Sequence, residues 1–419
     1  MFTEQMKNTI YIIILLCFTL ISSSLKSQKV IGFLGDWHHW ENPNYVSTGI
    51  NYDKLTDVVL AFVIPKSDGS YTYEPEFESQ LEEMVNQAHA KGRKVHISIG
   101  GYSATHNTDG SLISPDPMRQ MTSNAATRKK FVDAMIKMVK DYDLDGLNFD
   151  WEYPSSGDTY NLNQILYDLK LGLINLESEL GKTLELSIAV SASGYYSSAY
   201  NSTSLSYVDF VYIMAFDNGG DHHSSLSFAI SAMDFWLDSK NLEPKKIILA
   251  IPFYSKNNGQ WNGYYKDFSK SDPSAYFNDE DGSLNNRNYN SKPVLEAKID
   301  EINKRGGSGV FVWEIWGDRN DEYSLLNVLY SNLVGKKDLE KELGKVNIYP
   351  NPVNNILNIN TNKQNLLFTI TDVTGREIKN GKLAEGINHI ETESIDSRGI
   401  YFITISNGLT KVSHKIIKK

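Results

Sequence analysis

Short apolar runs rich in β-branched and aromatic residues alternate with amphipathic segments over most of the chain, from residue 29 to about residue 333. This alternation is typical of βα units, in which a buried parallel strand is followed by a helix that covers it. The pattern predicts eight strands, at residues 29–34, 57–64, 93–99, 145–151, 184–192, 208–216, 246–253 and 309–315.

Amphipathic helices are expected between these strands. Residues 78–91 carry apolar side chains at helical spacing and end before Gly92, and residues 130–139 and 293–305 show the same periodicity. Eight βα units predict an α/β fold, a (β/α)8 TIM barrel over residues 28–334, whose functional site lies at the C-terminal ends of the strands. An open, doubly wound sheet is the alternative that the pattern leaves open.

The pattern changes after the predicted barrel. Residues 346–419 contain short alternating segments separated by Gly, Asn and Pro, which predict a small all-β, sandwich-like domain. The stretch 335–345 is charged and bounded by glycines, and we interpret it as a linker. The chain therefore divides into a large barrel and a smaller C-terminal domain.

The N-terminus carries an apolar run at residues 10–21, followed by three serines. The run has the length of the hydrophobic region of a signal peptide and is short for a membrane span. We predict that residues 1–27 are a signal peptide, and that the mature protein is secreted or at the cell surface without stable membrane insertion. The one cysteine of the chain, Cys17, would be lost with it; a lipid anchor on Cys17 is the alternative, although no small residue precedes this cysteine.

Composition narrows the range of partners. The net charge of −10 is uneven: residues 346–419 carry nine Lys and Arg against six Asp and Glu, so this part is +3 and the rest of the chain is −13. An acidic main domain argues against nucleic acid or an anionic membrane as its partner. A hydrophobic content of 41% argues against a disordered chain.

The window at residues 145–154, DGLNFDWEYP, holds the candidate chemistry. Alternate residues of a strand share a face, so Gly146, Asn148, Asp150 and Glu152 point toward the barrel axis while the apolar residues between them pack under the helices. Buried polar groups are costly unless they are paired. Two carboxylates at the end of a barrel strand therefore indicate catalysis, with a hydrogen-bond network or a metal site as the alternatives.

This window resembles the D-G-x-D-x-D-x-E signature of glycoside hydrolase family 18, the chitinases and their relatives. Three further segments resemble motifs of this family in the same order: Ser98–Gly101 (S-x-G-G), Met214–Asp217 (M-x-Y-D) and Trp313 at the end of the last strand. The resemblance spans residues 29–333 and implies the same barrel.

The resemblance also implies a mechanism, substrate-assisted hydrolysis with retention of configuration. Glu152 would be the general acid and later the base, Asp150 would hold the 2-acetamido group of the substrate, and Asn148 would stand beside them. Trp313 would stack under the sugar at the cleavage point. The other residues expected to bind substrate are Asp217, Met214, Phe216, Tyr153, Trp37 and Gly101.

The sequence departs from the family pattern at two of these positions. Asn148 stands where the family has Asp, which removes a like charge and offers an N–H donor, and both changes favour an ionised Asp150. Phe216 stands where the family usually has a Tyr that contacts the acetamido group. A hydroxyl from Tyr153, Tyr195 or Tyr254 could replace it.

The C-terminal domain has a resemblance of its own. The segment NIYPNP at 347–352, TDVTGR at 371–376, GIYF at 399–402 and the basic end HKIIKK resemble the C-terminal sorting domain of the type nine secretion system of Bacteroidota. The resemblance implies the secretion machinery as a partner. A carbohydrate-binding sandwich is the alternative, although this domain has no Trp.

Three functions agree with these observations. A secreted chitinase that cleaves β-1,4-linked N-acetylglucosamine polymers is favoured; an endo-β-N-acetylglucosaminidase acting on the chitobiose core of N-glycans and a non-catalytic chitin-binding lectin are the alternatives. The short segment between the last two predicted strands, 255–307, leaves no room for the module that closes the groove in some family members, so we expect an open groove and internal cleavage. We expect a monomer without cofactor or metal, because no cysteine remains and His38, His39, His222 and His223 lack the H-E-x-x-H spacing.

Overall fold

The computed structural model describes residues 28–220, 222–278, 283–334, 343–372, 375–393, 395, 398–407 and 411–419. The predicted signal peptide and residues 335–342 of the predicted linker lie outside these ranges. Within them, no helix has both the length and the apolar character that crossing a membrane requires.

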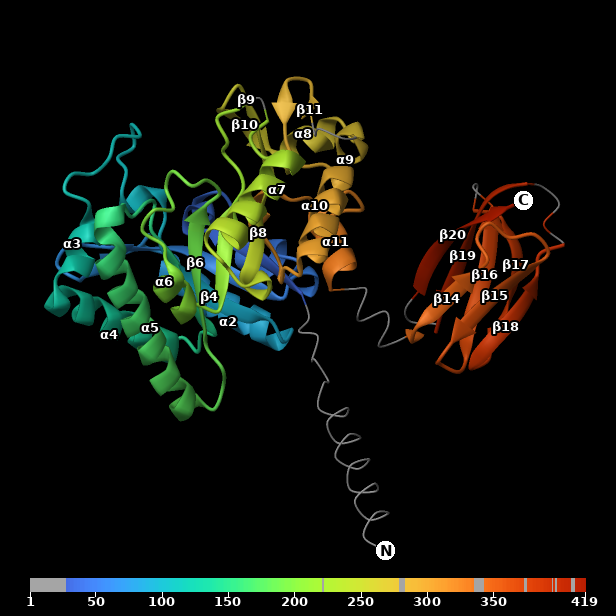
Figure 1. The fold of residues 1–419 in the computed structure, drawn as a ribbon, viewed down its shortest axis with the longest axis horizontal. Helices are drawn as coiled ribbons and strands as arrows, with labels where there is room; N and C mark the ends of the chain where they lie inside the picture. Colours follow the sequence, from blue (N-terminus) through green and yellow to red (C-terminus); the bar gives the residue numbers. More distant parts are fainter. Residues whose placement is uncertain are drawn as a thin grey trace, which may run out of the picture.

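Eight parallel strands form a closed barrel (Figure 1). The first strand pairs in parallel with both the second and the last, which closes the sheet and excludes the doubly wound alternative. All eight predicted strands are confirmed, with ends that differ by at most two residues: β1 (Lys29–Gly35), β2 (Asp57–Pro65), β4 (Lys94–Gly100), β5 (Gly146–Asp150), β6 (Glu185–Ser191), β7 (Phe210–Met214), β8 (Ile247–Pro252) and β13 (Gly309–Trp313).

Helices cover the outside of the strands, as Figure 1 shows. The three helices expected from periodicity are confirmed, as α2 (Phe77–Ala90), α4 (Ala125–Asp141) and α10 (Lys292–Arg305). The other helices of the barrel domain are α3 (Pro117–Ser123), α5 (Thr159–Leu180), α6 (Ser202–Tyr207), α7 (Leu226–Asp234), α8 (Tyr265–Ser271), α9 (Ser274–Phe277) and α11 (Leu325–Leu333).

The alternation of side chains along each strand gives the barrel two apolar layers. On β5, Leu147 and Phe149 face outward and join the core between strands and helices, together with Trp151 just beyond the strand. A second cluster fills the barrel interior and includes Phe33, Tyr212 and Phe311. The inward and outward faces predicted for this strand are therefore confirmed.

Charged side chains are buried near the N-terminal ends of the strands. Lys29 Nζ lies 2.6 Å from Asp57 Oδ1 and 2.8 Å from Glu185 Oε2, and Lys94 Nζ lies 2.5 Å from Glu185 Oε1. His96 Nε2 lies 3.2 Å from the same Asp57 oxygen. Burial alone would raise the pKa of Asp57, but the charge of Lys29 and the imidazole of His96 hold it well below its usual range. The lysine thus neutralises carboxylates that have lost their hydration.

Between β8 and β13 the chain builds a small antiparallel sheet with the order β10-β9-β12-β11. Figure 1 shows this sheet together with α8 and α9 at one edge of the barrel domain. This segment was expected to be too short for a groove-closing module, and the sequence pattern did not predict its short strands. They are β9 (Tyr254–Asn257), β10 (Gln260–Tyr264), β11 (Ser283–Leu284) and β12 (Arg287–Asn288); a further short strand, β3 (Tyr71–Thr72), pairs with the end of β2.

The C-terminal domain consists of two antiparallel sheets, β14-β15-β18 and β17-β16-β19-β20, which share one apolar core. Residues from both sheets, such as Leu357, Ile359, Phe368 and Ile403, are buried in this core. The predicted sandwich-like domain is therefore confirmed. Its strands are β14 (Val346–Tyr349), β15 (Ile356–Thr361), β16 (Leu366–Asp372), β17 (Glu377–Leu383), β18 (Gly386–Glu391), β19 (Gly399–Ser406) and β20 (Lys411–Lys418).

We predict that Lys29→Met lowers the free energy of unfolding of the barrel by about 3–5 kcal/mol, because it leaves Asp57 buried without its lysine and leaves Glu185 with Lys94 alone. Urea unfolding followed by tryptophan fluorescence measures this, since all seven tryptophans lie between residues 37 and 316. Lys245→Met is the matched control; its side chain is 75% exposed, so we expect a change below about 1 kcal/mol. Equal losses in both variants would contradict the assigned role of Lys29.

Candidate active site

Two carboxyl groups stand at the C-terminal end of β5, inside the barrel. Asp150 is the last residue of the strand and pairs in register with Gly100 of β4 and Ala189 of β6. An added Cβ at Gly100 would come within 2.0 Å of the Asp150 carbonyl oxygen, so only glycine allows this close approach. Glu152 follows two residues later, and its backbone oxygen accepts a 2.5 Å hydrogen bond from Thr105 Oγ1.

Asn148 lies one layer deeper and is fully buried. Its side-chain oxygen accepts a hydrogen bond from Ser98 Oγ, and its Nδ2 donates one to Ser187 Oγ, both at 2.9 Å. Each neighbouring strand therefore holds this amide by one hydrogen bond. Within the described residues the bonded N–H of Asn148 goes to Ser187, and Asp150 Oδ1 receives no hydrogen bond from it.

Burial controls the protonation of the two carboxyls. Asp150 is 5% exposed, and its Oδ1 has no hydrogen-bond partner within the part of the chain that the structure describes. Burial raises the pKa of Asp150 well above its usual value, and the neighbouring Glu152 raises it further. The raised pKa arises because desolvation of the charged form outweighs any relief from the like charge that Asn148 removes.

Glu152 is shifted in the same direction. Burial raises its pKa to about 7, and the charge of Asp217 adds to this, against the opposing effects of the Tyr153 hydroxyl and the Tyr102 backbone N–H. A carboxyl with such a pKa carries a proton that it can donate near neutral pH. It can also take a proton back, so the site is suited to general acid and base chemistry.

The shifted pKa predicts a pH-dependent stability. The folded chain keeps the Glu152 proton up to about pH 7, whereas the unfolded chain releases it near the ordinary glutamate value of 4.5. The stability tied to this proton is present below pH 4.5 and is lost as pH rises toward 7. The melting temperature of Glu152→Gln should therefore rise relative to the parent across this interval. The exposed Glu322→Gln should show no such trend, and a difference for Glu152→Gln that does not vary with pH would contradict the shift.

A cavity of about 160 Å³ opens onto both carboxyls, and we call it the axial cavity. It brings together six of the residues expected from the sequence: Asp150, Glu152, Met214, Phe216, Asp217 and Trp313. The expected Tyr153, Trp37, Gly101 and Asn148 do not line it. Five lining residues were missed, of which Phe33 and Phe311 occupy inward-facing strand positions that the alternation could have revealed; the others are Phe62, Tyr102 and Ala189.

Aromatic rings wall one side of the axial cavity. The ring centroid of Trp313 lies 6.0 Å from Phe33, 5.6 Å from Phe62 and 6.1 Å from Trp37. Gly101 has φ +76°, and an added Cβ there would lie 2.6 Å from the Phe62 ring. The absence of a side chain at Gly101 therefore leaves room for the Phe62 ring in the wall of the axial cavity, although Gly101 itself does not line that cavity.

Asp217 lies on the wall formed by the end of β7. Its Oδ1 accepts a hydrogen bond from the Tyr254 hydroxyl at 2.6 Å and lies 2.8 Å from Lys256 Nζ and 3.5 Å from His223 Nδ1. Burial opposes ionisation, but these three groups lower the pKa of Asp217 to about 2. Asp217 is thus a fixed negative charge that faces Glu152.

The three tyrosines considered as replacements for a hydroxyl at Phe216 differ in their surroundings. The hydroxyl of Tyr254 is bound to Asp217, and the side chain of Tyr153 interacts with Glu152. Tyr195 is 82% exposed and packs against Tyr196. Only Tyr153 and Tyr254 therefore have hydroxyls directed to the carboxyls of the site.

The remaining loop tryptophans divide into packed and exposed residues. Trp316 is buried and stacks on His38 at 4.4 Å, so it is a packing residue. Trp40 and Trp261 are 64% and 60% exposed, and neither lines the axial cavity.

One group among the described residues has the spacing of a metal site: Asp57, His96 and Glu185 offer three ligand atoms within 4.8 Å of one another. Lys29 Nζ already contacts both carboxylates of this group. A lysine ammonium therefore supplies the positive charge that a metal ion would bring.

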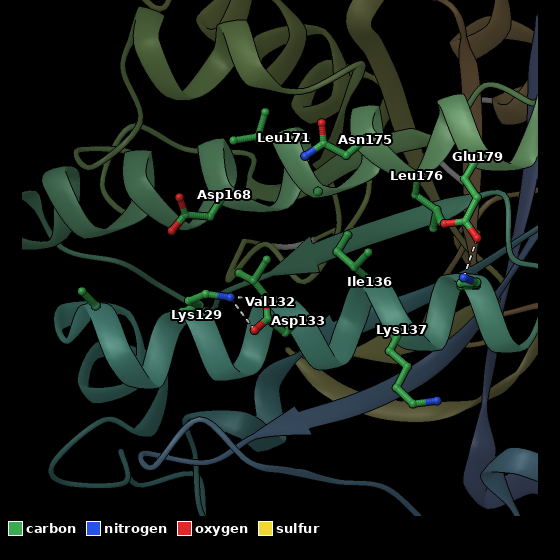
Figure 2. Close-up of a pocket in the computed structure, with 13 residues that line it drawn as sticks. Lys129, Val132, Asp133, Ile136, Lys137, Asp168, Leu171, Asn175, Leu176 and Glu179 are labelled. Atoms are coloured by element: carbon green, nitrogen blue, oxygen red, sulfur yellow. Dashed lines mark hydrogen bonds and ion pairs between the residues drawn. The ribbon is translucent and has the colours of Figure 1, made fainter.

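A larger cavity of about 770 Å³ lies between α4 and α5 on the outside of the barrel (Figure 2). Aliphatic side chains such as Ile136 and Leu171 line it, and the pairs Lys129–Asp133 and Lys140–Glu179 border it. None of the candidate catalytic residues reaches this groove. Asp150 and Glu152 line the smaller axial cavity instead.

The fold and the site together define a (β/α)8-barrel protein with two carboxyls of raised pKa at the C-terminal end of its strands. Residues 29–318 match the family described as Glycosyl hydrolases family 18, and the chain belongs to this family of glycosidases. Residues 347–419 match the secretion system C-terminal sorting domain, which marks the protein as secreted or cell-surface.

Several known proteins resemble the chain at low identity. Endochitinase 1 of Metarhizium anisopliae is 24% identical over 303 residues, which cover 60% of this chain and 68% of that protein. A chitinase from Bacteroides thetaiotaomicron superimposes with a TM-score of 0.60 at 22% identity, over 74% of this chain and 98% of the other. The family 18 chitinase ChiB of Flavobacterium johnsoniae gives a TM-score of 0.60 at 22% identity, over 74% and 96%. These structures share the fold of the barrel.

Proposed function

We propose that the protein hydrolyses the β-1,4 linkages of chitin outside the cell and retains the configuration at the cleaved carbon. The observation that carries this proposal is the buried pair Asp150 and Glu152, with raised pKa values, in a cavity beside Trp313. Membership of family 18 and the similarity to the Metarhizium endochitinase support the choice of substrate.

In the proposed reaction, the protonated Glu152 donates its proton to the glycosidic oxygen as the bond to the leaving sugar breaks. The acetamido oxygen of the substrate attacks the anomeric carbon, and an oxazolinium ion forms. Asp150 accepts a hydrogen bond from the acetamido N–H, which orients that group, and the positive charge that develops beside it lowers the pKa of Asp150. Glu152, now a carboxylate, then takes a proton from the water that opens the ring.

Asp217 contributes electrostatically. Lys256 and Tyr254 hold it ionised, and its charge keeps the proton on Glu152 until that proton passes to the glycosidic oxygen as the glycosidic bond breaks. Trp313 supplies an aromatic face for a sugar ring, and Met214 and Phe216 complete an apolar wall. A dry cavity of this kind strengthens each of these interactions.

We further propose cleavage within the polymer by a monomeric enzyme. No residue of the segment 254–291 lines the axial cavity within the described part of the chain, which supports an open groove. We also propose that residues 1–27 are removed on export and that residues 346–419 direct secretion through the type nine system, as the match to the sorting domain supports.

A second candidate function is cleavage of the chitobiose core of N-glycans. The departures at Asn148 and Phe216 favour it, because both change the surroundings of the acetamido group. The non-catalytic lectin is less well supported, since Glu152 is present and has the protonation of an acid.

We expect the purified full chain to release oligosaccharides of several lengths from a chitin hexamer, and Glu152→Gln to lower kcat/KM by about 10²–10⁴-fold because the proton donor is lost. Chromatography of the products measures both, with a high-mannose glycoprotein assayed in parallel. Cleavage of the glycoprotein alone would select the second function. Binding of both substrates without turnover by the parent would leave the lectin, and release of disaccharide only from the first minute would contradict internal cleavage.

We predict that Asn148→Asp shifts the acidic limb of the pH profile of kcat/KM to higher pH. A carboxylate between Ser98 and Ser187 adds a negative charge below Asp150 and raises the pKa of the Asp150–Glu152 pair further. Initial rates between about pH 3 and pH 9 measure the shift. Asn124→Asp, at the exposed start of α4, is the control for the added charge, and superimposable profiles for Asn148→Asp and the parent would contradict the prediction.

A further inference from the structure

A second cavity, of about 200 Å³, lies beside the axial cavity at the same end of the barrel. We call it the Asp36 cavity; its walls include Asp36, Trp37, Phe62, Thr72, Glu74 and Ser103. Phe62 lines both cavities, and the Trp37 ring lies 6.1 Å from the Trp313 ring. A chain molecule on Trp313 can therefore continue across Trp37 into the Asp36 cavity.

Two aromatic rings of the Asp36 cavity pack closely against backbone at glycine positions. The rings of Trp37 and Phe62 are nearly parallel, with an interplanar angle of 28° and centroids 6.5 Å apart. A Cβ at Gly35 would lie 2.3 Å from the Trp37 ring, and a Cβ at Gly101 would lie 2.6 Å from the Phe62 ring. Two glycines thus allow two aromatic rings to lie flat against the backbone, and Trp37 keeps 37% of its surface exposed.

A buried carboxyl faces this aromatic wall. Asp36 is 3% exposed, and its Oδ2 accepts a hydrogen bond of 3.3 Å from the backbone N–H of Glu74. Among the residues that the structure describes, no Lys, Arg or His lies within 4 Å of the Asp36 carboxyl. Burial raises its pKa to about 7, and the carboxylate of Glu74 adds to the shift.

Two other buried carboxyls of the barrel, Asp57 and Asp318, have partners that explain their burial. Asp57 is neutralised by Lys29, and Asp318 accepts the backbone N–H groups at the start of α11. Asp36 begins the short 3-10 helix η1 (Asp36–Trp40), and the backbone N–H groups of Asp36 and Trp37 act on its carboxyl. Within the described residues it still contacts no cation, and it lines a cavity large enough for a ligand group. A positive charge from outside the chain would stabilise the ionised form of a carboxyl in this setting.

We propose that the Asp36 cavity binds a sugar unit with a free, protonated 2-amino group, so that the enzyme favours partly deacetylated chitin over fully acetylated chitin. The ammonium would lie between the carboxyls of Asp36 and Glu74, and the ring face would lie on Trp37. An acetylated unit offers neither charge nor a comparable donor. This inference rests on the proposed function in that the neighbouring unit of the same chain occupies the axial cavity.

The test measures binding in the full-length Glu152→Gln chain by calorimetry at about pH 7. The probes are a fully acetylated chitin tetramer and two tetramers with one free amine, at either terminal unit. We expect one of the amine-bearing tetramers to bind about tenfold or more tightly than the acetylated one, as a charge-assisted pair at a part-buried site implies. The advantage should shrink when salt is added, because the pair is electrostatic.

Two substitutions in the same background locate the effect. Asp36→Asn and Glu74→Gln should each bring the ratio of the two affinities toward one. Glu74 is exposed, so if Asp36→Asn fails to fold, the ratio measured in Glu74→Gln tests the proposal. Glu82→Gln, an exposed carboxyl of α2 outside the cavity, should leave the ratio as it is. Equal affinities for acetylated and amine-bearing tetramers, or an advantage that survives both substitutions, would overturn the proposal.

The proposed function can fail separately. If the parent chain cleaves no chitin, the catalytic assignment falls, while the ratio of affinities in the Glu152→Gln chain still decides whether the Asp36 cavity selects an amine.

Discussion

Burial of charge along the barrel axis is the constraint on which this structure depends. Parallel strands send every second side chain inward, and in this barrel the inward positions hold polar groups at three levels. At the first level Lys29 neutralises Asp57 and Glu185, and at the second Asn148 is satisfied by two serines. At the third level Asp150 and Glu152 contact no cation among the residues that the structure describes, and their burial raises their pKa values.

The burial of Asp150 and Glu152 has opposite effects on the stability of the fold and on the proposed activity. A carboxyl that is buried in its protonated form destabilises the fold as pH rises, because the proton is then lost. The same proton, retained up to neutral pH, is the one that an acid catalyst donates. Asp217 shows the alternative arrangement. Three groups hold it ionised at the edge of the cavity, and its charge acts on Glu152 in turn.

The sequence predicted the parts of the molecule that have a regular period. All eight barrel strands and the inward face of β5 follow from buried runs and from the two-residue repeat, and the helices follow from their 3.6-residue repeat. It also placed Asp150, Glu152 and Asp217 together, because each ends a strand at the same end of a barrel. The partners of Asn148 could not be predicted, since Ser98 and Ser187 come from strands 50 and 39 residues away. The sheet of β9 to β12 and the Asp36 cavity were also missed, because both are built from short loop segments without a period.

The central claim is that Glu152 holds a proton up to neutral pH in the folded enzyme. Carbon-13 NMR of the full chain labelled at glutamate side-chain carboxyls, with the Glu152→Gln spectrum used to assign the signal, measures this directly. The account predicts that the Glu152 signal titrates with a midpoint near pH 7. A midpoint near the ordinary glutamate value of 4.5 would contradict it.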